Sequence, residues 1–320
     1  MSTEAADRFA PFVATLGRGP GRSRALSRGE ARAAFGMVLG GEPDPHQVGA
    51  FLMLLRYRGE DAEEITGLVE AARAAFAGRI DGAADLDWPS YGAGRTRGLP
   101  WFLLAALALA RAGVRVLMHG TNEFSAGVGV PGALAALGLS PASSLADAAL
   151  RLERDRFAYL PLAVLSPAMQ RLLGLRALFG LRSPVNTVAR LLDPAAAASG
   201  VDGVFHPPYI DVHLGVAERL GRPRLLVLKG GGGEAERSPV KPLAAHLWDG
   251  AARSVLELPG WAGERPARES DPALLPALWR RETRLGEDTV LGTVALALLA
   301  LGRAAAPEEA DRMAAEVWRG

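Results

Sequence analysis

The stretch Leu99-Pro-Trp-Phe-Leu-Leu-Ala-Ala-Leu-Ala-Leu-Ala-Arg-Ala-Gly-Val-Arg-Val-Leu-Met118 decides the fold class. Its first part is an apolar helix pattern rich in Leu and Ala, and Val114–Met118, directly after a glycine, is typical of a short buried strand. Arg224–Leu228 and Ser254–Leu258 are further predicted strands, and Ile210–Leu220 is a predicted helix. Alternating helices and strands predict an α/β domain with a mostly parallel central sheet.

The N-terminal part of the chain carries helix signals instead. A capping box begins at Ser27, and Asp44 and Asp61 are predicted N-cap residues of the next two helices. The sequence therefore predicts a small helical domain beside the larger α/β domain. We place the helical domain at residues 1–80 with about 144–185, and the α/β domain at 81–143 with about 186–320.

Composition excludes several classes of protein. The 320 residues include no cysteine, which rules out disulfide scaffolds, thiolate zinc sites and cysteine nucleophiles. The longest apolar stretches, 99–112 and 290–301, are shorter than the ~18–20 residues of a membrane span. The first residues lack a basic segment followed by an apolar one, so we expect a cytoplasmic protein with no membrane partner.

Charge is unevenly distributed along the chain, although 36 basic and 35 acidic residues nearly balance. Residues 60–87 carry a net charge of −6, whereas three arginine-bearing stretches contain no acid: 88–118, 156–192 and 219–233. If the strands end at one face, the loops at 91–98 and 229–237 line a cleft that binds anions. The alternative is that these arginines are scattered and solvated.

Two glycine-rich loops strengthen the first interpretation. Gly92-Ala-Gly-Arg-Thr-Arg-Gly98 precedes a predicted helix, and Lys229-Gly-Gly-Gly-Gly233 follows a predicted strand, so their amides could hold a phosphate group. Neither loop has the P-loop or the dinucleotide-binding pattern. His119, at a strand end, is either a ligand-binding residue or a histidine satisfied by a nearby main-chain group.

The order of these segments, with His119-Gly120, Ser166-Pro-Ala-Met169 and Gly180-Leu-Arg182, resembles the anthranilate phosphoribosyltransferase family. The resemblance covers nearly the whole chain. It implies a small helical domain joined to a larger α/β domain, with the substrates between them. It also places Arg176 where the family has an arginine that contacts anthranilate.

The departures from the family pattern fall on the chemistry. Ser90-Tyr-Gly-Ala-Gly94 stands where the family's phosphoribosyl pyrophosphate loop reads Gly-Thr-Gly-Gly-Asp. The family's magnesium-binding Asp-Glu pair falls on Ala235-Glu236, so Glu236 is the one candidate metal ligand. We therefore predict no catalytic residue and no resident cofactor, and Mg²⁺ only if transferase activity is retained.

This pattern of departures is similar to the YbiB-like branch of the fold. The resemblance implies a homodimer that binds nucleic acid, DNA or RNA, without sequence preference, and we expect arginines to hold the phosphates. The alternative is a glycosyl- or phosphoribosyltransferase with altered substrate and phosphoribosyl pyrophosphate as ligand. The residues predicted to bind nucleic acid or phosphate are Gly92, Gly94, Arg95, Thr96, Arg97, His119, Asn122, Arg176, Arg182, Lys229, Gly230, Gly231 and Arg237.

Overall fold

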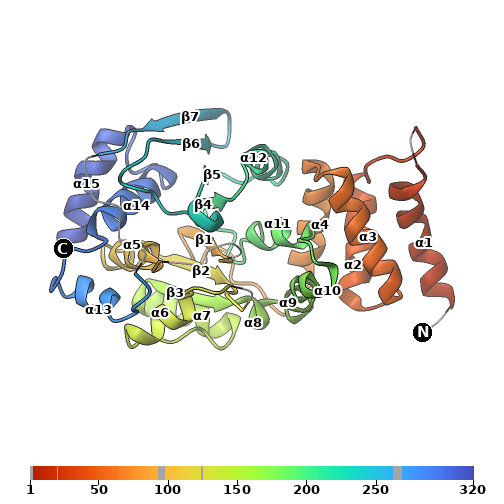
Figure 1. Ribbon diagram of the computed structural model, residues 1–320, viewed down its shortest axis with the longest axis horizontal. Coiled ribbons are helices and arrows are strands. Elements are labelled where there is room, and N and C mark those ends of the chain that lie inside the picture. Colours follow the sequence, from red (N-terminus) through yellow and green to blue (C-terminus); the bar gives the residue numbers. More distant parts are fainter. Residues whose placement is uncertain (1–2, 20, 93–97, 124, 262–268) are drawn as a thin grey trace.

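A seven-stranded sheet forms the centre of the larger part of the molecule (Figure 1). The structure is a computed structural model that describes residues 3–19, 21–92, 98–123, 125–261 and 269–320. In space the strands follow the order β3-β2-β1-β4-β5-β6-β7, parallel from β3 to β5 and antiparallel from β5 to β7. The strands are β1 Leu86–Ser90, β2 Val116–Gly120, β3 Phe157–Pro161, β4 Ser199–Val204, β5 Arg224–Lys229, β6 Leu243–Trp248 and β7 Arg253–Leu258.

Helices cover both faces of the parallel part of this sheet, which is why β1 to β5 are almost wholly buried, whereas β7 at the edge is largely exposed. Leu226 and Leu228 of β5 pack in the core that contains α5 (Trp101–Arg111), α14 (Glu287–Ala300) and α15 (Pro307–Arg319). The intervening Leu225 and Val227 face α12 (Tyr209–Arg219) on the other side. The predicted mostly parallel α/β architecture is confirmed.

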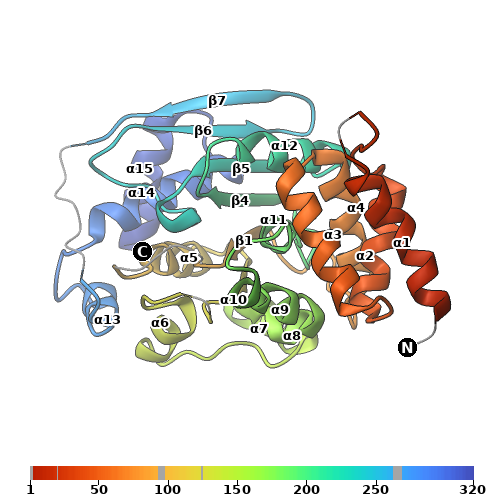
Figure 2. The same cartoon turned by 45° about the vertical axis from the view of Figure 1, so that its right-hand side comes forward.

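Four helices form the helical part at the other end of the molecule, as both cartoons show (Figures 1 and 2). They are α1 Thr3–Gly17, α2 Arg28–Gly40, α3 Pro45–Arg58 and α4 Ala62–Ala74. The capping residues that the sequence predicts are present, because Ser27, Asp44 and Asp61 accept main-chain hydrogen bonds at the starts of α2, α3 and α4. Helix α4 ends at Ala74.

The remaining helices connect the strands or pack against the helical part. They are α6 Val130–Ala136, α7 Leu145–Asp155, α8 Leu162–Leu165, α9 Pro167–Gly174, α10 Arg176–Phe179, α11 Val185–Arg190 and α13 Leu274–Trp279, with the short 3-10 helix η1 Gly231–Gly233. In the described residues no helix has the length and apolar character needed to cross a bilayer. The exact division into domains at residues 80, 144 and 185 stays a prediction.

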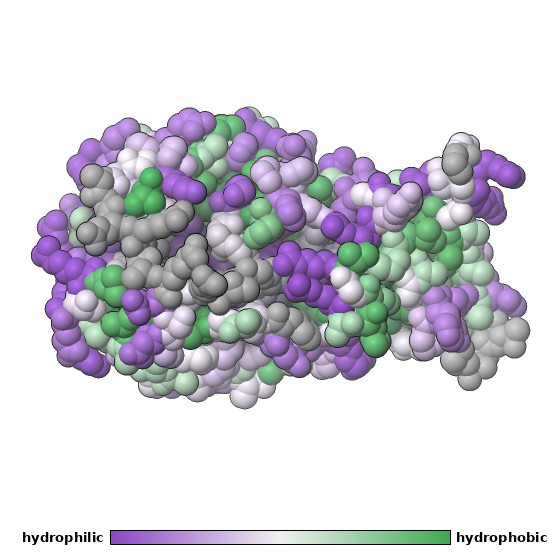
Figure 3. Space-filling view, viewed as in Figure 1, coloured by the Kyte–Doolittle hydropathy of each residue, from purple (hydrophilic) through white to green (hydrophobic). Residues whose placement is uncertain are grey.

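One face of the molecule shows apolar side chains near α10, beside the helical part (Figure 3). Leu178 is 82% exposed and Leu181 is 56% exposed there. Hydrophilic side chains dominate much of the rest of this face. The expected homodimer stays a prediction.

Helices α2 and α4 cross in direct contact because α4 has a glycine at the crossing point. A Cβ on Gly67 would lie 2.2 Å from the carbonyl oxygen of Arg28 and 2.9 Å from the Cβ of Ala31. The Arg28 oxygen is a backbone atom and the Ala31 Cβ is bonded directly to the backbone, so neither atom can move independently of α2. The spacing between these helices therefore depends on the missing side chain.

We expect Gly67→Ala to lower the free energy of unfolding by about 1–3 kcal/mol, because the added methyl group overpacks the crossing. Gly36→Ala is the matched control within α2, since a Cβ there meets nothing within 4 Å. It should raise stability by about 0.5–1 kcal/mol, as glycine costs entropy inside a helix. Urea unfolding curves measure both; equal effects of the two substitutions would contradict the close crossing.

Candidate anion-binding site

The carboxyl ends of β1, β2, β4 and β5 lie at the same edge of the sheet, because these neighbouring strands are parallel. Open α/β sheets bind their ligands at this edge, where the loops after the strands come together. Here the residues that follow β1, beginning with Tyr91, lie against the loop after β5, although the two are about 140 residues apart in sequence. This meeting of loops is the first component of the site.

Glu234, in the loop after β5, joins the two loops. Its Oε1 accepts hydrogen bonds from the main-chain N–H groups of Tyr91 at 3.2 Å and Gly92 at 2.5 Å. The side chain is buried. The main-chain N–H groups that directly follow β1 therefore donate to a carboxylate of the protein itself.

The main chain around Glu234 is fixed by close contacts. A Cβ on Gly230 would lie 1.7 Å from the carbonyl oxygen of Glu234, and one on Gly203 would lie 2.2 Å from its carbonyl carbon. These two strand-end glycines let the loop fold directly onto β4 and β5. The position of Glu234 is thus set by backbone packing.

A second carboxylate from the same loop lies at the start of α5. Glu236 Oε2 accepts a hydrogen bond from the Phe102 N–H at 3.1 Å. The N-cap residue of helix α5 is Pro100, whose side chain makes no capping hydrogen bond. Glu236 therefore supplies an acceptor for one of the amides that every helix start leaves without an intrahelical partner.

A separate pocket lies at the junction of the helical and α/β parts, and it is rich in arginine. Three parts of the chain line it. They are Arg56 of α3 with Glu60 of the turn that follows; Arg182, Ser183, Asn186, Thr187 and Arg190; and Val204, Phe205, His206, Tyr209 and His213 of the β4–α12 region. Its volume is about 70 Å³. At ~10–15 Å³ per water molecule, this space holds about five waters or one small anionic group.

The guanidinium groups of this pocket are close enough to perturb one another. Burial lowers the pKa of Arg182, and the positive charges of Arg176, Arg190 and Arg56 lower it further. Arg190 donates to main-chain carbonyl oxygens, Asn186 O at 3.3 Å and Gly233 O at 3.5 Å, and lies 5.6 Å above the Tyr91 ring. A bound anion would reduce this repulsion, because its negative charge favours the charged form of each guanidinium group.

Glu60 is the acidic residue of the pocket. It accepts hydrogen bonds from the hydroxyls of Thr187 and Tyr209, the latter at 3.1 Å, and lies 3.8 Å from the Arg56 guanidinium. Burial raises the pKa of Glu60, against the opposing effect of the two hydroxyls and the charges of Arg56 and His213. The carboxyl group thus ties the turn after α3 to α11 and α12.

A buried ionic chain lies beneath the site. Arg222 contacts Asp87 at 3.0 Å and Asp193 at 3.6 Å, and Asp193 also lies 3.7 Å from Arg73 of α4. Although burial opposes it, the charges and hydrogen bonds of His119 and Arg222 lower the pKa of Asp87. The chain therefore links β1 to the helical part through paired charges.

Comparison with known proteins gives the family. A model of the glycosyl transferase family's helical bundle domain matches residues 11–76, and a model of its a/b domain matches residues 102–258. The anthranilate phosphoribosyltransferase of Beijerinckia indica is 32% identical over 83% of this chain and 77% of its own length. The chain belongs to the anthranilate phosphoribosyltransferase-like glycosyltransferase family.

Other members agree over longer spans. The Parvibaculum lavamentivorans anthranilate phosphoribosyltransferase is 32% identical over 96% of this chain and 92% of its own. The solved Thermus thermophilus enzyme matches 98% of this chain and 94% of its own, with 25% identity and a TM-score of 0.82. The Saccharomyces cerevisiae enzyme, solved with phosphoribosyl pyrophosphate and Mg²⁺, has 18% identity, covers 98% and 94%, and gives a TM-score of 0.77. The resemblance inferred from the sequence is confirmed at the level of this family.

Two of the predicted ligand-binding residues, His119 and Arg237, are buried among internal partners. His119 is fully buried, with its Nε2 3.2 Å from Asp87 Oδ1 and its Nδ1 3.0 Å from the Tyr91 hydroxyl. Arg237 is also fully buried; it donates to Asp311 at 2.6 Å and stacks 4.5 Å from the Trp261 ring. These side chains are engaged with internal groups of the protein, and their predicted role in ligand binding stays a prediction.

The other predicted residues are distributed as follows. Arg182 lines the arginine pocket, and Arg176 lies outside its lining but near enough to affect Arg182. Asn122 accepts a hydrogen bond from the Val130 N–H at the start of α6. Lys229 is exposed at the end of β5. Gly92, Gly230 and Gly231 belong to the two loops that meet, whereas Gly94, Arg95, Thr96 and Arg97 lie outside the described residues.

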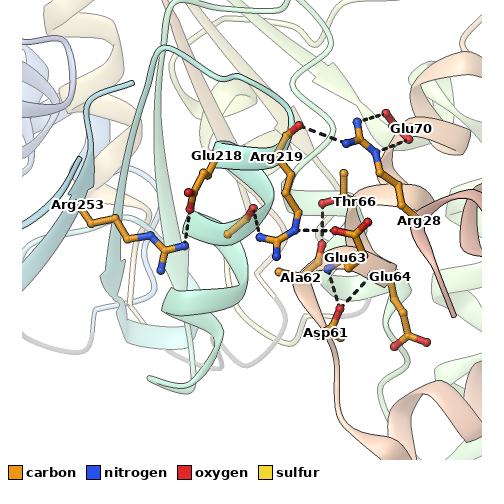
Figure 4. Close-up of polar contacts among 11 residues, drawn as sticks. Arg28, Asp61, Ala62, Glu63, Glu64, Thr66, Glu70, Glu218, Arg219 and Arg253 are labelled. Carbon is orange, nitrogen blue, oxygen red and sulfur yellow. Dashed lines mark hydrogen bonds and ion pairs between the residues drawn. The ribbon is translucent and has the colours of Figure 1, made fainter. Parts of the chain in front are cut away.

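The uneven charge distribution along the sequence disappears in space. Acidic residues of 60–87 pair with arginines from the acid-free stretches and with Arg28, which brings opposite charges together. In Figure 4, Arg28 binds Glu70 and Arg219 binds Glu63, across α2, α4 and α12. Arg115 binds Asp85 in the same way, at 2.6 Å. Arg28, Arg115 and Arg219 are thus engaged in ion pairs. The anion-binding cleft expected between the loops 91–98 and 229–237 stays a prediction, since residues 93–97 lie outside the described part of the chain.

The residues present do not fit a carboxylate-bound Mg²⁺. Glu236, at one position of the family's pair, and Glu234, beside the pair, both direct carboxylate oxygens to main-chain N–H groups. The described residues contain no group of three His, Cys, Asp or Glu side chains placed to hold a metal ion. We therefore derive no step through Mg²⁺, and Glu236 serves as a helix cap.

Sequence reasoning missed Arg56, Glu60, Arg190, Tyr209 and Glu234. Arg190 stood within an acid-free stretch, and this was the one signal that could have selected it. Glu60 and Glu234 lie in turns between elements, and only the assembled fold shows that they face α12 and the residues after β1.

The raised pKa of Glu60 gives a pH-dependent stability. The folded protein keeps this proton to a higher pH than the unfolded chain, whose carboxyl has the ordinary pKa of 4.5. Stability due to Glu60 is therefore lost as the pH rises above that value. We expect Glu60→Gln to gain stability relative to the wild type between about pH 4.5 and 7, measured by denaturant unfolding. Glu153→Gln, on exposed α7, controls for net charge; a difference that does not vary with pH would contradict this account.

Proposed function

We propose that this protein is a glycosyltransferase with altered substrate, which transfers a pentosyl group to an acidic acceptor held in the arginine pocket. The observation that carries the proposal is the convergence of Arg56, Arg182 and Arg190 on one cavity. Relatives at 32% identity are named anthranilate phosphoribosyltransferases, and anthranilate is an aromatic carboxylate. The pocket offers cations for such a carboxylate.

The aromatic residues of the pocket suit the rest of that ligand. Phe205, His206 and Tyr209 line the same cavity, and the Phe205 and His206 rings lie 4.7 Å apart in an edge-to-face contact. Guanidinium groups bind carboxylates with paired hydrogen bonds and pack on aromatic faces. A planar acid of one ring therefore matches the lining in charge and in shape.

Binding of anthranilate to the full chain tests the acceptor part of the proposal. We expect Arg182→Gln and Arg190→Gln each to weaken binding roughly ten- to hundredfold, because a hydrogen bond to a charged group contributes about 1.5–3 kcal/mol. Calorimetry measures this, with Arg171→Gln on the exposed side of α9 as the matched arginine control. Equal affinity for anthranilate and its uncharged amide would contradict the proposal.

Transfer is tested in the same mixtures by mass spectrometry. Ribose 1-phosphate and phosphoribosyl pyrophosphate are supplied in turn as donors. We expect a pentosylated acceptor with the wild-type chain and none with Arg190→Gln. Acceptor binding without product from either donor would leave a binding protein and overturn the transferase.

Nucleic-acid binding is the second candidate function, and the observation in its favour is the mutual repulsion around Arg182. A concentration of positive charge attracts polyanions as well as small acids. The expected affinity for a single-stranded oligonucleotide falls with salt between about 50 and 200 mM, with a log–log slope of ~0.7 per phosphate. Fluorescence anisotropy measures this slope; a flat response would remove the candidate, and Arg182→Gln should lower the slope.

A further inference from the structure

The two loops that meet at the carboxyl ends of the strands enclose a small second cavity. Its lining includes Ser90, Gly92, Phe102, Asn122, Ser125 and Glu234. The free volume is about 10 Å³, which is room for about one water molecule. The Glu234 carboxylate occupies the space next to the Gly92 N–H.

Hydrogen-bond donors lie around the carboxylates of Glu234 and Glu236. The Tyr91 and Gly92 amides point at Glu234, and the Phe102 amide at the start of α5 points at the neighbouring Glu236. The Ser90 hydroxyl is buried, and its Oγ has no hydrogen-bond partner among the described residues. Successive amides, a helix start and a hydroxyl form a cradle for a tetrahedral oxyanion.

Glu234 takes the place that such an oxyanion would fill. Its main chain cannot withdraw without breaking the close packing against Gly203 and Gly230. A phosphate group beside Gly92 would overlap with the Glu234 carboxylate. It would also be repelled by the negative charge of that carboxylate, because like charges repel strongly in a buried setting.

We propose that Glu234 is the resident anion of this cradle and excludes phosphate and diphosphate groups from it. This consequence rests on the proposed function: the pentosyl donor places no diphosphate group at the carboxyl end of β1. Glu234 is thus a residue that determines donor specificity, and its removal should open a site for an inorganic anion.

Titration of the full chain with inorganic pyrophosphate, without Mg²⁺, tests the proposal by calorimetry. The wild type should give no binding heat at millimolar pyrophosphate. Glu234→Ala should bind it at least about tenfold more tightly, because a like-charge contact and its volume are both removed. Glu257→Ala, on exposed β7, changes the net charge equally and should behave as the wild type.

Two outcomes would overturn the proposal. One is wild-type binding as tight as that of Glu234→Ala, and the other is no binding by a folded Glu234→Ala chain. If that variant does not fold, Glu234→Gln removes the charge and keeps the shape, and the absence of any gain in pyrophosphate binding would again overturn it.

The pyrophosphate result is independent of the acceptor. Anthranilate binding tests the arginine pocket, whereas pyrophosphate binding tests the cradle, and the two share no substituted residue. Failure of the first with success of the second removes the proposed transferase and leaves Glu234 as the anion of its cradle.

Discussion

The buried ionic chain from Arg73 through Asp193 and Arg222 to Asp87 holds the two parts of the molecule in one geometry. Each member is buried or partly buried, so an unpaired charge left by a substitution would be strongly unfavourable. Asp87 lies in β1, the central strand of the parallel region, and Arg73 lies in α4. The pocket around Arg182 lies at the same junction, and its shape therefore depends on charges that no ligand touches.

Local signals in the sequence were sufficient for the elements that depend on local chemistry. The N-caps at Ser27, Asp44 and Asp61 were predictable because side chain and amide are neighbours in the chain. No bounds for β1, β3, β4 and β6 were predicted from the sequence. In β1 and β4, Asp87, Pro89 and Asp202 interrupt the apolar patterns. Both aspartates are buried beside histidine partners that come from other elements, so hydropathy gives no sign of their burial.

The functional residues could be predicted only in part, for a physical reason. The acid-free stretches included Arg182 and Arg190, which line the pocket, but contacts between distant elements decide which arginines lie at a cavity. Arg115 is paired with Asp85 and Arg219 with Glu63, while Arg237 is enclosed by Asp311 and Trp261. Net charge per segment cannot separate these cases, because each partner comes from a different element.

The strand-end glycines Gly203 and Gly230 have a consequence for how this family can change its chemistry. The loop that carries Glu234 is positioned by main-chain contacts alone at these points. The side chains around it can therefore be exchanged while the loop keeps its course. A single substitution at position 234 can then decide whether the amides at this edge of the sheet bind a ligand anion or the carboxylate of the protein itself. Ligand chemistry can thus evolve while the backbone stays the same.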